Sequence, residues 1–152
     1  MSVNKKILLV EDDPMDVELS LTALNEYQIV NSVDVVRDGA EALDYLFRRG
    51  NFKTRDEQNP VVVILDLKLP KVSGLEVLRQ LKADTQLKLV PVVILTSSRE
   101  EQDLLASYKL GVNAYVVKPV EFHKFVEAVK ELGLFWMVMN EVPAPSHHPL
   151  LK

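Results

Sequence analysis

The sequence predicts an α/β protein in which helices cover both faces of an open, doubly wound parallel sheet. Two observations lead to this fold class. Five short segments rich in Val, Ile and Leu are typical of strands, and each is followed by a segment with helical spacing of apolar residues. Most of the strand segments are apolar throughout, as in parallel strands buried on both faces. Because such crossovers are right-handed, five repeats give a doubly wound sheet.

The first half of the chain contains two strand–helix repeats. The segment "KILLV" at 6–10 is a continuous apolar strand, and 14–27 is a helix whose first-turn proline costs no hydrogen bond. A β-branched, alternating strand follows at 32–36. The next helix spans 38–50, with an aspartate as a possible cap and Gly50 as a possible stop.

The second half contains three more repeats. The strongest strand in the sequence is "VVVILD" at 61–66, and the helix at 73–84 carries leucines on one face. A buried strand at 90–97 precedes a helix at 99–111 that ends in a glycine. The last strand, "AYVVK" at 114–118, is short.

Three further segments remain to be assigned. An amphipathic helix is expected at 121–132. The segment 50–60 is a long polar loop, and the tail from 133 onward lies outside the repeats.

Composition restricts the function classes. A chain of 152 residues with 47% apolar and 26% charged residues fits one globular domain. The net charge of −4 does not suggest a nucleic-acid surface, and the lack of cysteine excludes disulfides and thiolate metal sites. No signal-peptide pattern or run of about 20 apolar residues is present, so we expect a cytoplasmic protein with no membrane contact.

Polar residues concentrate where the predicted strands end. They are Glu11, Asp12 and Asp13 after the first strand, Asp66 at the third, Thr96 and Ser97 at the fourth, and Lys118 with Pro119 at the fifth. In doubly wound sheets the ligand lies outside the carboxyl ends of the strands. We therefore expect these side chains to form one site.

The residue types at these ends indicate phosphoryl chemistry. Neighbouring carboxylates repel one another, and Mg²⁺ relieves this repulsion through one or two carboxylates, water and phosphate. Asp66 can act as a nucleophile toward phosphorus, Lys118 can offset charge on the phosphoryl group, and Thr96 offers it a hydroxyl. A single aspartate at a strand end is more often a helix cap, so the interpretation depends on the combination.

Four motifs, "LLVEDD", "ILDLKLPKVSGLEVL", "VVILTSS" and "AYVVKP", resemble those of the receiver domains of two-component response regulators. They stand in the family's order and spacing, and the resemblance covers residues 4–132. It implies a flavodoxin-like sheet with strand order 2-1-3-4-5 and a Mg²⁺-dependent phosphoprotein that catalyses only its own phosphotransfer and dephosphorylation.

The resemblance also implies a role for each matching residue. Asp66 matches the phosphoacceptor, and Glu11 and Asp12 match the acidic pair, with Asp12 the more direct Mg²⁺ ligand. Together with Asp66 and the backbone carbonyl of Lys68, this pair would form the metal site. The role of Asp13 stays open.

Three further positions match the switch and the phosphate contact of the family. Thr96 matches the switch hydroxyl, Lys118 the phosphate-binding lysine, and Tyr115 the aromatic switch, although simple packing would also explain this tyrosine. The bond between Lys118 and Pro119 is expected to be cis by the same resemblance.

Rival classes fail at specific positions. A haloacid-dehalogenase-type phosphatase would carry an acid two residues after its nucleophile, where this chain has Lys68. A nucleotide-binding α/β protein would need a glycine-rich loop after the first strand, and none follows Val10. A pseudo-receiver, which is a binding module that is not phosphorylated, stays open.

The tail suggests how the signal leaves the protein. Only 20 residues follow Leu132, too few for a separate output domain, so we expect a stand-alone receiver at 4–132 and an extension at 133–152. The extension is apolar on all sides over 133–139, which a solvated helix is not. We expect a homodimer through the last helix and this segment, with an interface formed by Leu134, Phe135, Trp136 and Met137. The alternative is that the tail folds back onto its own domain.

The loop before the third strand and the aromatic tail ending in "NEVP" resemble cyanobacterial phytochrome-associated response regulators. This narrower resemblance implies that the partner is a sensor histidine kinase of the phytochrome type.

Overall fold

A computed structural model describes residues 6–25, 32–55, 58–97, 114–118, 121, 123–124 and 126–127. Within these ranges, five strands form one parallel sheet in the order β2-β1-β3-β4-β5. The strands are β1 (Ile7–Val10), β2 (Val33–Val36), β3 (Val62–Asp66), β4 (Val92–Thr96) and β5 (Ala114–Val117). The predicted fold class and strand order are confirmed.

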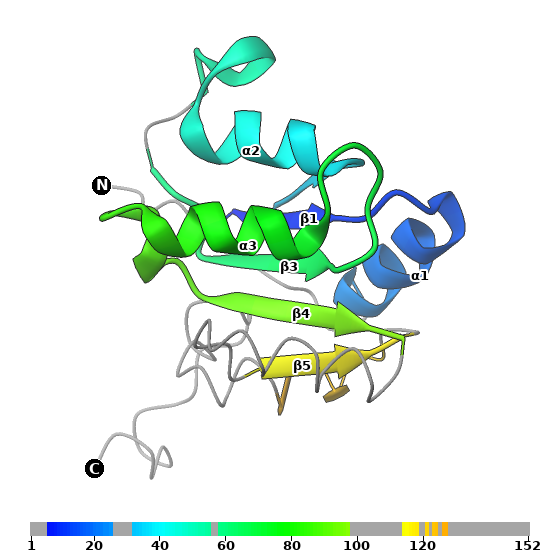
Figure 1. Cartoon of the computed structure of the whole chain (residues 1–152). Coiled ribbons are helices and arrows are strands. Elements are labelled where there is room, and N and C mark those ends of the chain that lie inside the picture. The colour runs from blue at the N-terminus through cyan, green and yellow to red at the C-terminus, as the bar shows by residue number, and fades with distance from the viewer. Residues whose placement is uncertain are drawn as a thin grey trace, which may run out of the picture.

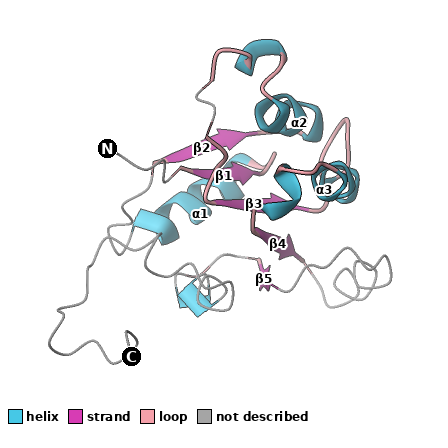
Figure 2. Cartoon of the chain, turned by 90° about the vertical axis from the view of Figure 1, so that its left-hand side faces the viewer, coloured by secondary structure: helices cyan, strands magenta, loops and turns pink. Residues whose placement is uncertain are grey.

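Three described helices cover the two faces of the sheet. They are α1 (Pro14–Asn25), α2 (Gly39–Phe47) and α3 (Gly74–Ala83). Helices α2 and α3 lie side by side on one face, and α1 lies on the other (Figures 1 and 2). The predicted helix at 99–111, most of the predicted helix at 121–132 and the tail lie outside the described residues.

Each face of the sheet has its own apolar core. In β1, Ile7 and Leu9 join the core that includes Val17 of α1, whereas Leu8 and Val10 join the core of α2 and α3. All four residues of β1 are fully buried. This two-sided burial is the reason why β1 is apolar throughout, and each large side chain so buried contributes about 1.5–3 kcal/mol.

The two ends of α2 differ in how well the sequence predicted them. Asp38 caps the N-terminus as expected, because its side chain accepts a hydrogen bond from Glu41 N. The predicted stop at Gly50 is wrong, since the helix ends at Phe47 and Arg48 takes a left-handed conformation with φ 55°. There, Arg48 N and Arg49 N donate to carbonyl oxygens of the last turn and close the helix early.

The segment predicted as a polar loop at 50–60 is partly folded against α2. A 3₁₀ turn at Gly50–Phe52 brings the Phe52 ring edge-on to Tyr45, with 5.2 Å between ring centroids. The Arg55 guanidinium lies 4.3 Å from the centroid of the Tyr45 ring, and Arg55 Nε donates to the Tyr45 carbonyl oxygen. Buried Tyr45 therefore anchors this segment.

The carboxyl ends of the strands share one edge of the sheet, as the parallel register requires. Asp66 and Thr96 are the last residues of β3 and β4, and Lys118 directly follows β5. Among the described residues, no helix has the length and apolar character needed to cross a membrane.

Candidate functional site

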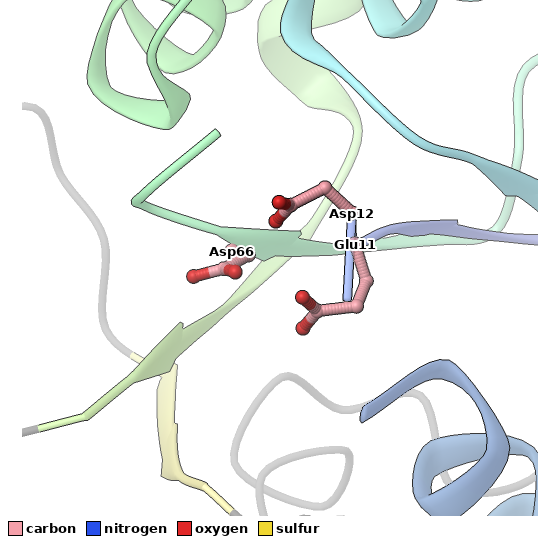
Figure 3. Close-up of side chains that lie close together, drawn as sticks. All are labelled: Glu11, Asp12 and Asp66. Atoms are coloured by element: carbon pink, nitrogen blue, oxygen red, sulfur yellow. The ribbon is translucent and has the colours of Figure 1, made fainter. Parts of the chain in front are cut away.

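Three carboxylates meet at the ends of β1 and β3 (Figure 3). One oxygen each from Glu11, Asp12 and Asp66 can be chosen so that all three lie within 4.8 Å of one another. Glu11 and Asp66 are buried, whereas Asp12 is exposed. The predicted acidic pair and the predicted phosphoacceptor are therefore brought together.

The ammonium group of Lys118 reaches this cluster from the end of β5. Its Nζ atom lies 2.8 Å from Asp66 Oδ2 and 2.9 Å from Glu11 Oε1. A third carboxylate oxygen, Oδ2 of Asp16 on α1, lies 3.2 Å away. The lysine side chain is 19% exposed, so the cation is largely enclosed by acids.

Backbone N–H groups orient two of the carboxylates. Lys68 N donates to Asp66 Oδ1 at 3.2 Å, and Asp13 N donates to Glu11 Oε2 at 3.2 Å. The side chain of Asp13, whose role the sequence leaves open, accepts from Met15 N at 2.8 Å. Asp13 thus caps the start of α1 just beside the acids.

The two predicted switch residues lie on neighbouring strands. Thr96 is fully buried, and its carbonyl oxygen accepts from Lys118 N at 2.9 Å. Tyr115 is half-buried on β5, and its burial raises the pKa of the phenol above its ordinary value. Thr96 lies at the carboxyl end of β4, beside the strand that ends in Asp66. The Lys118–Pro119 bond and the predicted dimer residues Leu134, Phe135, Trp136 and Met137 fall outside the described residues.

A comparison with models of protein families identifies the family of this chain. The model described as "Response regulator receiver domain" matches residues 7–130. The chain belongs to the response regulator receiver family.

Several solved structures similar to this chain are phytochrome response regulators. The solved structure "Bacteriophytochrome response regulator RtBRR" is 62% identical, with a TM-score of 0.86, over 95% of this chain and 87% of that one. The phosphorylated cyanobacterial phytochrome response regulator RcpA is 38% identical, with a TM-score of 0.71, over 94% of this chain and 99% of that one.

Response regulator Rcp1 from Synechocystis sp. is 37% identical over 92% of this chain and 94% of its own length. A structure of an Mn²⁺-bound form of Rcp1 superposes with a TM-score of 0.70, at 37% identity and with 92% of this chain and 99% of that one covered. The predicted resemblance to phytochrome-associated regulators is confirmed.

Burial sets the charge state of the receiver site. Desolvation raises the pKa of Glu11 to about 7, and the charge on Asp66 adds to the rise, although the hydrogen bond to Lys118 opposes it. Burial alone would lower the pKa of Lys118, but hydrogen bonds to Asp66 and Glu11 outweigh it and raise this pKa above its ordinary value. Lys118 is therefore cationic at neutral pH.

The donor set fits a hard divalent cation. It offers only carboxylate oxygens, and Mg²⁺ and Mn²⁺ prefer oxygen ligands to nitrogen or sulfur. Three carboxylates, those of Glu11, Asp16 and Asp66, contact one ammonium group, and Asp12 adds a fourth carboxylate to the cluster. This excess of negative charge favours the binding of a cation.

Sequence reasoning missed Asp16. Its sequence signal is an ordinary one, since an acid in the first turn of a helix usually complements the helix dipole. Its partner Lys118 lies 102 positions further along the chain, so no local pattern reveals the pair.

Proposed function

We propose that this receiver protein accepts a phosphoryl group on Asp66 from a histidine kinase and passes the signal on through protein contacts. One observation carries the proposal. Asp66, an acid pair and a lysine ammonium converge at the carboxyl edge of the sheet, with Lys118 Nζ 2.8 Å from Asp66 Oδ2. The structure of the related RcpA, a phosphorylated cyanobacterial phytochrome response regulator, supports the same chemistry.

In this reaction a carboxylate oxygen of Asp66 attacks the phosphorus of a phosphohistidine. A new O–P bond forms, the P–N bond breaks, and the imidazole leaves with the electron pair of that bond. Lys118 would stay protonated and place its charge beside the phosphoryl oxygens, while Lys68 N holds the second oxygen of Asp66 in place.

Residues of the same cluster would hold a divalent metal ion. Asp12, Asp66 and the backbone carbonyl of Lys68 would be direct ligands, and Glu11 would be a less direct one. A bound cation would supply positive charge to the phosphoryl oxygens in the transition state. The exposure of Asp12 and the burial of Glu11 against Lys118 support the ranking of Asp12 as the more direct ligand.

The signal would pass through the two residues beside the acceptor. Phosphorylation adds about two negative charges. Thr96 would turn its hydroxyl toward the phosphoryl group, and Tyr115 on the next strand would take up the vacated space. The surface around β5 and the segments predicted as helices at 99–111 and 121–132 would change in response.

The relatives favour a phytochrome-type kinase as the partner. The similarity to the bacteriophytochrome response regulator extends over 95% of this chain, and RcpA is a cyanobacterial phytochrome response regulator. We infer a cytoplasmic location from that partner. The division into a receiver at 4–132 and an extension at 133–152, and a homodimer through Leu134, Phe135, Trp136 and Met137, belong to the same proposal.

Incubation with phosphoramidate and Mg²⁺, followed by intact mass measurement, tests the proposed function. Wild type should gain one phosphoryl group, and Asp66→Asn should gain none. Excess EDTA should slow the reaction of wild type, and Asp12→Ala should lose Mg²⁺ binding more than Glu11→Gln does. A wild-type protein that gains no mass would instead be a pseudo-receiver, and equal phosphorylation of Asp66→Asn would move the acceptor elsewhere.

A further inference from the structure

Lys118 is held by carboxylates from three separate parts of the fold. Glu11 follows β1, Asp66 ends β3, and Asp16 belongs to the first turn of α1. Two of these acids, Glu11 and Asp66, also belong to the oxygen cluster that fits a metal ion. Asp16 does not belong to that cluster, so among the described residues it is the one partner of Lys118 without a second assignment.

Glu11 and Asp66 would no longer be available to Lys118 when a cation and a phosphoryl group occupy the site. A phosphoryl group on Asp66 would occupy a carboxylate oxygen, and a cation in the cluster would attract the charge of Glu11. Lys118 would then have to leave Asp66 Oδ2 for a phosphoryl oxygen. Of the three carboxylates that contact Lys118 in the described part of the chain, that of Asp16 alone would stay available to the ammonium group throughout this change.

The position of Asp16 is fixed by its own surroundings. Asp13 Oδ1 accepts from Met15 N at 2.8 Å and from Asp16 N at 3.4 Å, so the first turn of α1 begins at a defined point beside the site. Val17, the next residue, is buried in the core under the sheet and sets the rotation of the helix. Side chains of a helix tilt toward its N-terminus, which here directs Asp16 toward Lys118.

A role limited to the helix dipole does not require this contact. Any acid in the first turn stabilises a helix through its dipole, whichever way it points. Asp16 instead lies 3.2 Å from the ammonium group, and its side chain is only 28% exposed. We propose that Asp16 is a positioning residue, which keeps the Lys118 ammonium over the site while Glu11 and Asp66 are engaged. This inference rests on the proposed phosphorylation of Asp66.

Three variants on α1 separate this role from a general loss of charge. Asp16→Asn removes the negative charge at nearly constant shape, and Asp16→Glu restores it. Glu18→Gln removes the same charge from an exposed position of the same helix and serves as the matched control. We expect Asp16→Asn to slow phosphorylation by phosphoramidate at saturating donor by about 3- to 10-fold. Asp16→Glu should recover part of the rate, and Glu18→Gln should match wild type.

The effect must depend on Lys118 if it acts through that residue. In a Lys118→Ala background, Asp16→Asn should cause no further loss of rate, because the group that it positions is gone. An equal fold-loss in both backgrounds, or a wild-type rate for Asp16→Asn itself, would overturn the inference.

A second readout does not depend on activity. With Mg²⁺ present, the ¹H–¹⁵N signal of the Lys118 ammonium group should be visible in wild type and in Glu18→Gln, and should be lost in Asp16→Asn because its protons exchange faster with water. A signal that persists in Asp16→Asn would contradict the inference. If wild type is not phosphorylated at all, the proposed function fails, and this spectrum still decides whether Asp16 holds Lys118.

Discussion

Replacing Glu11 by glutamine should remove a pH dependence from the stability of the metal-free protein. Glu11 is fully buried, and its pKa rises from the model-compound value of 4.5 to about 7 on folding. Between these two values the folded protein keeps a proton that the unfolded chain has lost, so the free energy of unfolding falls as pH rises. A rise from 4.5 to about 7 corresponds to a loss of up to about 3 kcal/mol.

Urea unfolding in EDTA, followed by circular dichroism at several values between pH 4.5 and pH 8, would measure this loss. Glu11→Gln resembles the protonated form at every pH. Its free energy of unfolding relative to wild type should therefore rise as the pH is raised through this window. Lys118 adds no slope there, because its pKa is raised and its ammonium stays charged. Parallel curves for the two proteins would show that Glu11 titrates as an exposed glutamate does and would refute the reasoning.

Three further changes test other parts of the structure. Arg48→Gly should raise the free energy of unfolding by about 1 kcal/mol, because Arg48 has φ 55°, whereas Arg48→Ala should not stabilise the protein; urea unfolding of both variants would check this. A Cβ on Gly74 would overlap the carbonyl oxygen of Asp66, so Gly74→Ala should cost about 1–3 kcal/mol and also slow phosphorylation. Gly39→Ala, which meets Val72 instead, should destabilise the fold without a matching loss of phosphorylation rate, and equal rate losses in the two glycine variants would contradict this. Thr96→Ala should still accept a phosphoryl group but lose most of the phosphate-dependent change in partner binding; full retention would assign the switch to another residue.

The sequence predicted the sheet and the site for the same physical reason. Continuous apolar segments such as "KILLV" require burial on both faces, which only a parallel sheet between two helix layers provides. Such a sheet brings its carboxyl ends to one edge. Any polar residue at these ends therefore joins the site, and Glu11, Asp66 and Lys118 do so.

The features that sequence reasoning missed depend on distant or competing contacts. Asp16 pairs with a lysine that follows β5, 102 positions further along the chain, a contact that no local spacing indicates. The early end of α2 depends on Arg48, which takes the left-handed conformation that glycine would normally supply. In the sequence, Arg55 has the character of a solvated loop residue, because its contact with the Tyr45 ring is seen only in the structure.

The most direct test of the central claim is to locate the phosphoryl group chemically. Borohydride reduces an aspartyl phosphate to homoserine, so peptide mass measurement after phosphorylation and reduction identifies the acceptor. Treatment with phosphoramidate and Mg²⁺ followed by borohydride should convert residue 66 to homoserine in the peptide that contains "ILDLK". Conversion at another acid, with Asp66 unchanged, would contradict the assignment of Asp66 as the phosphoacceptor.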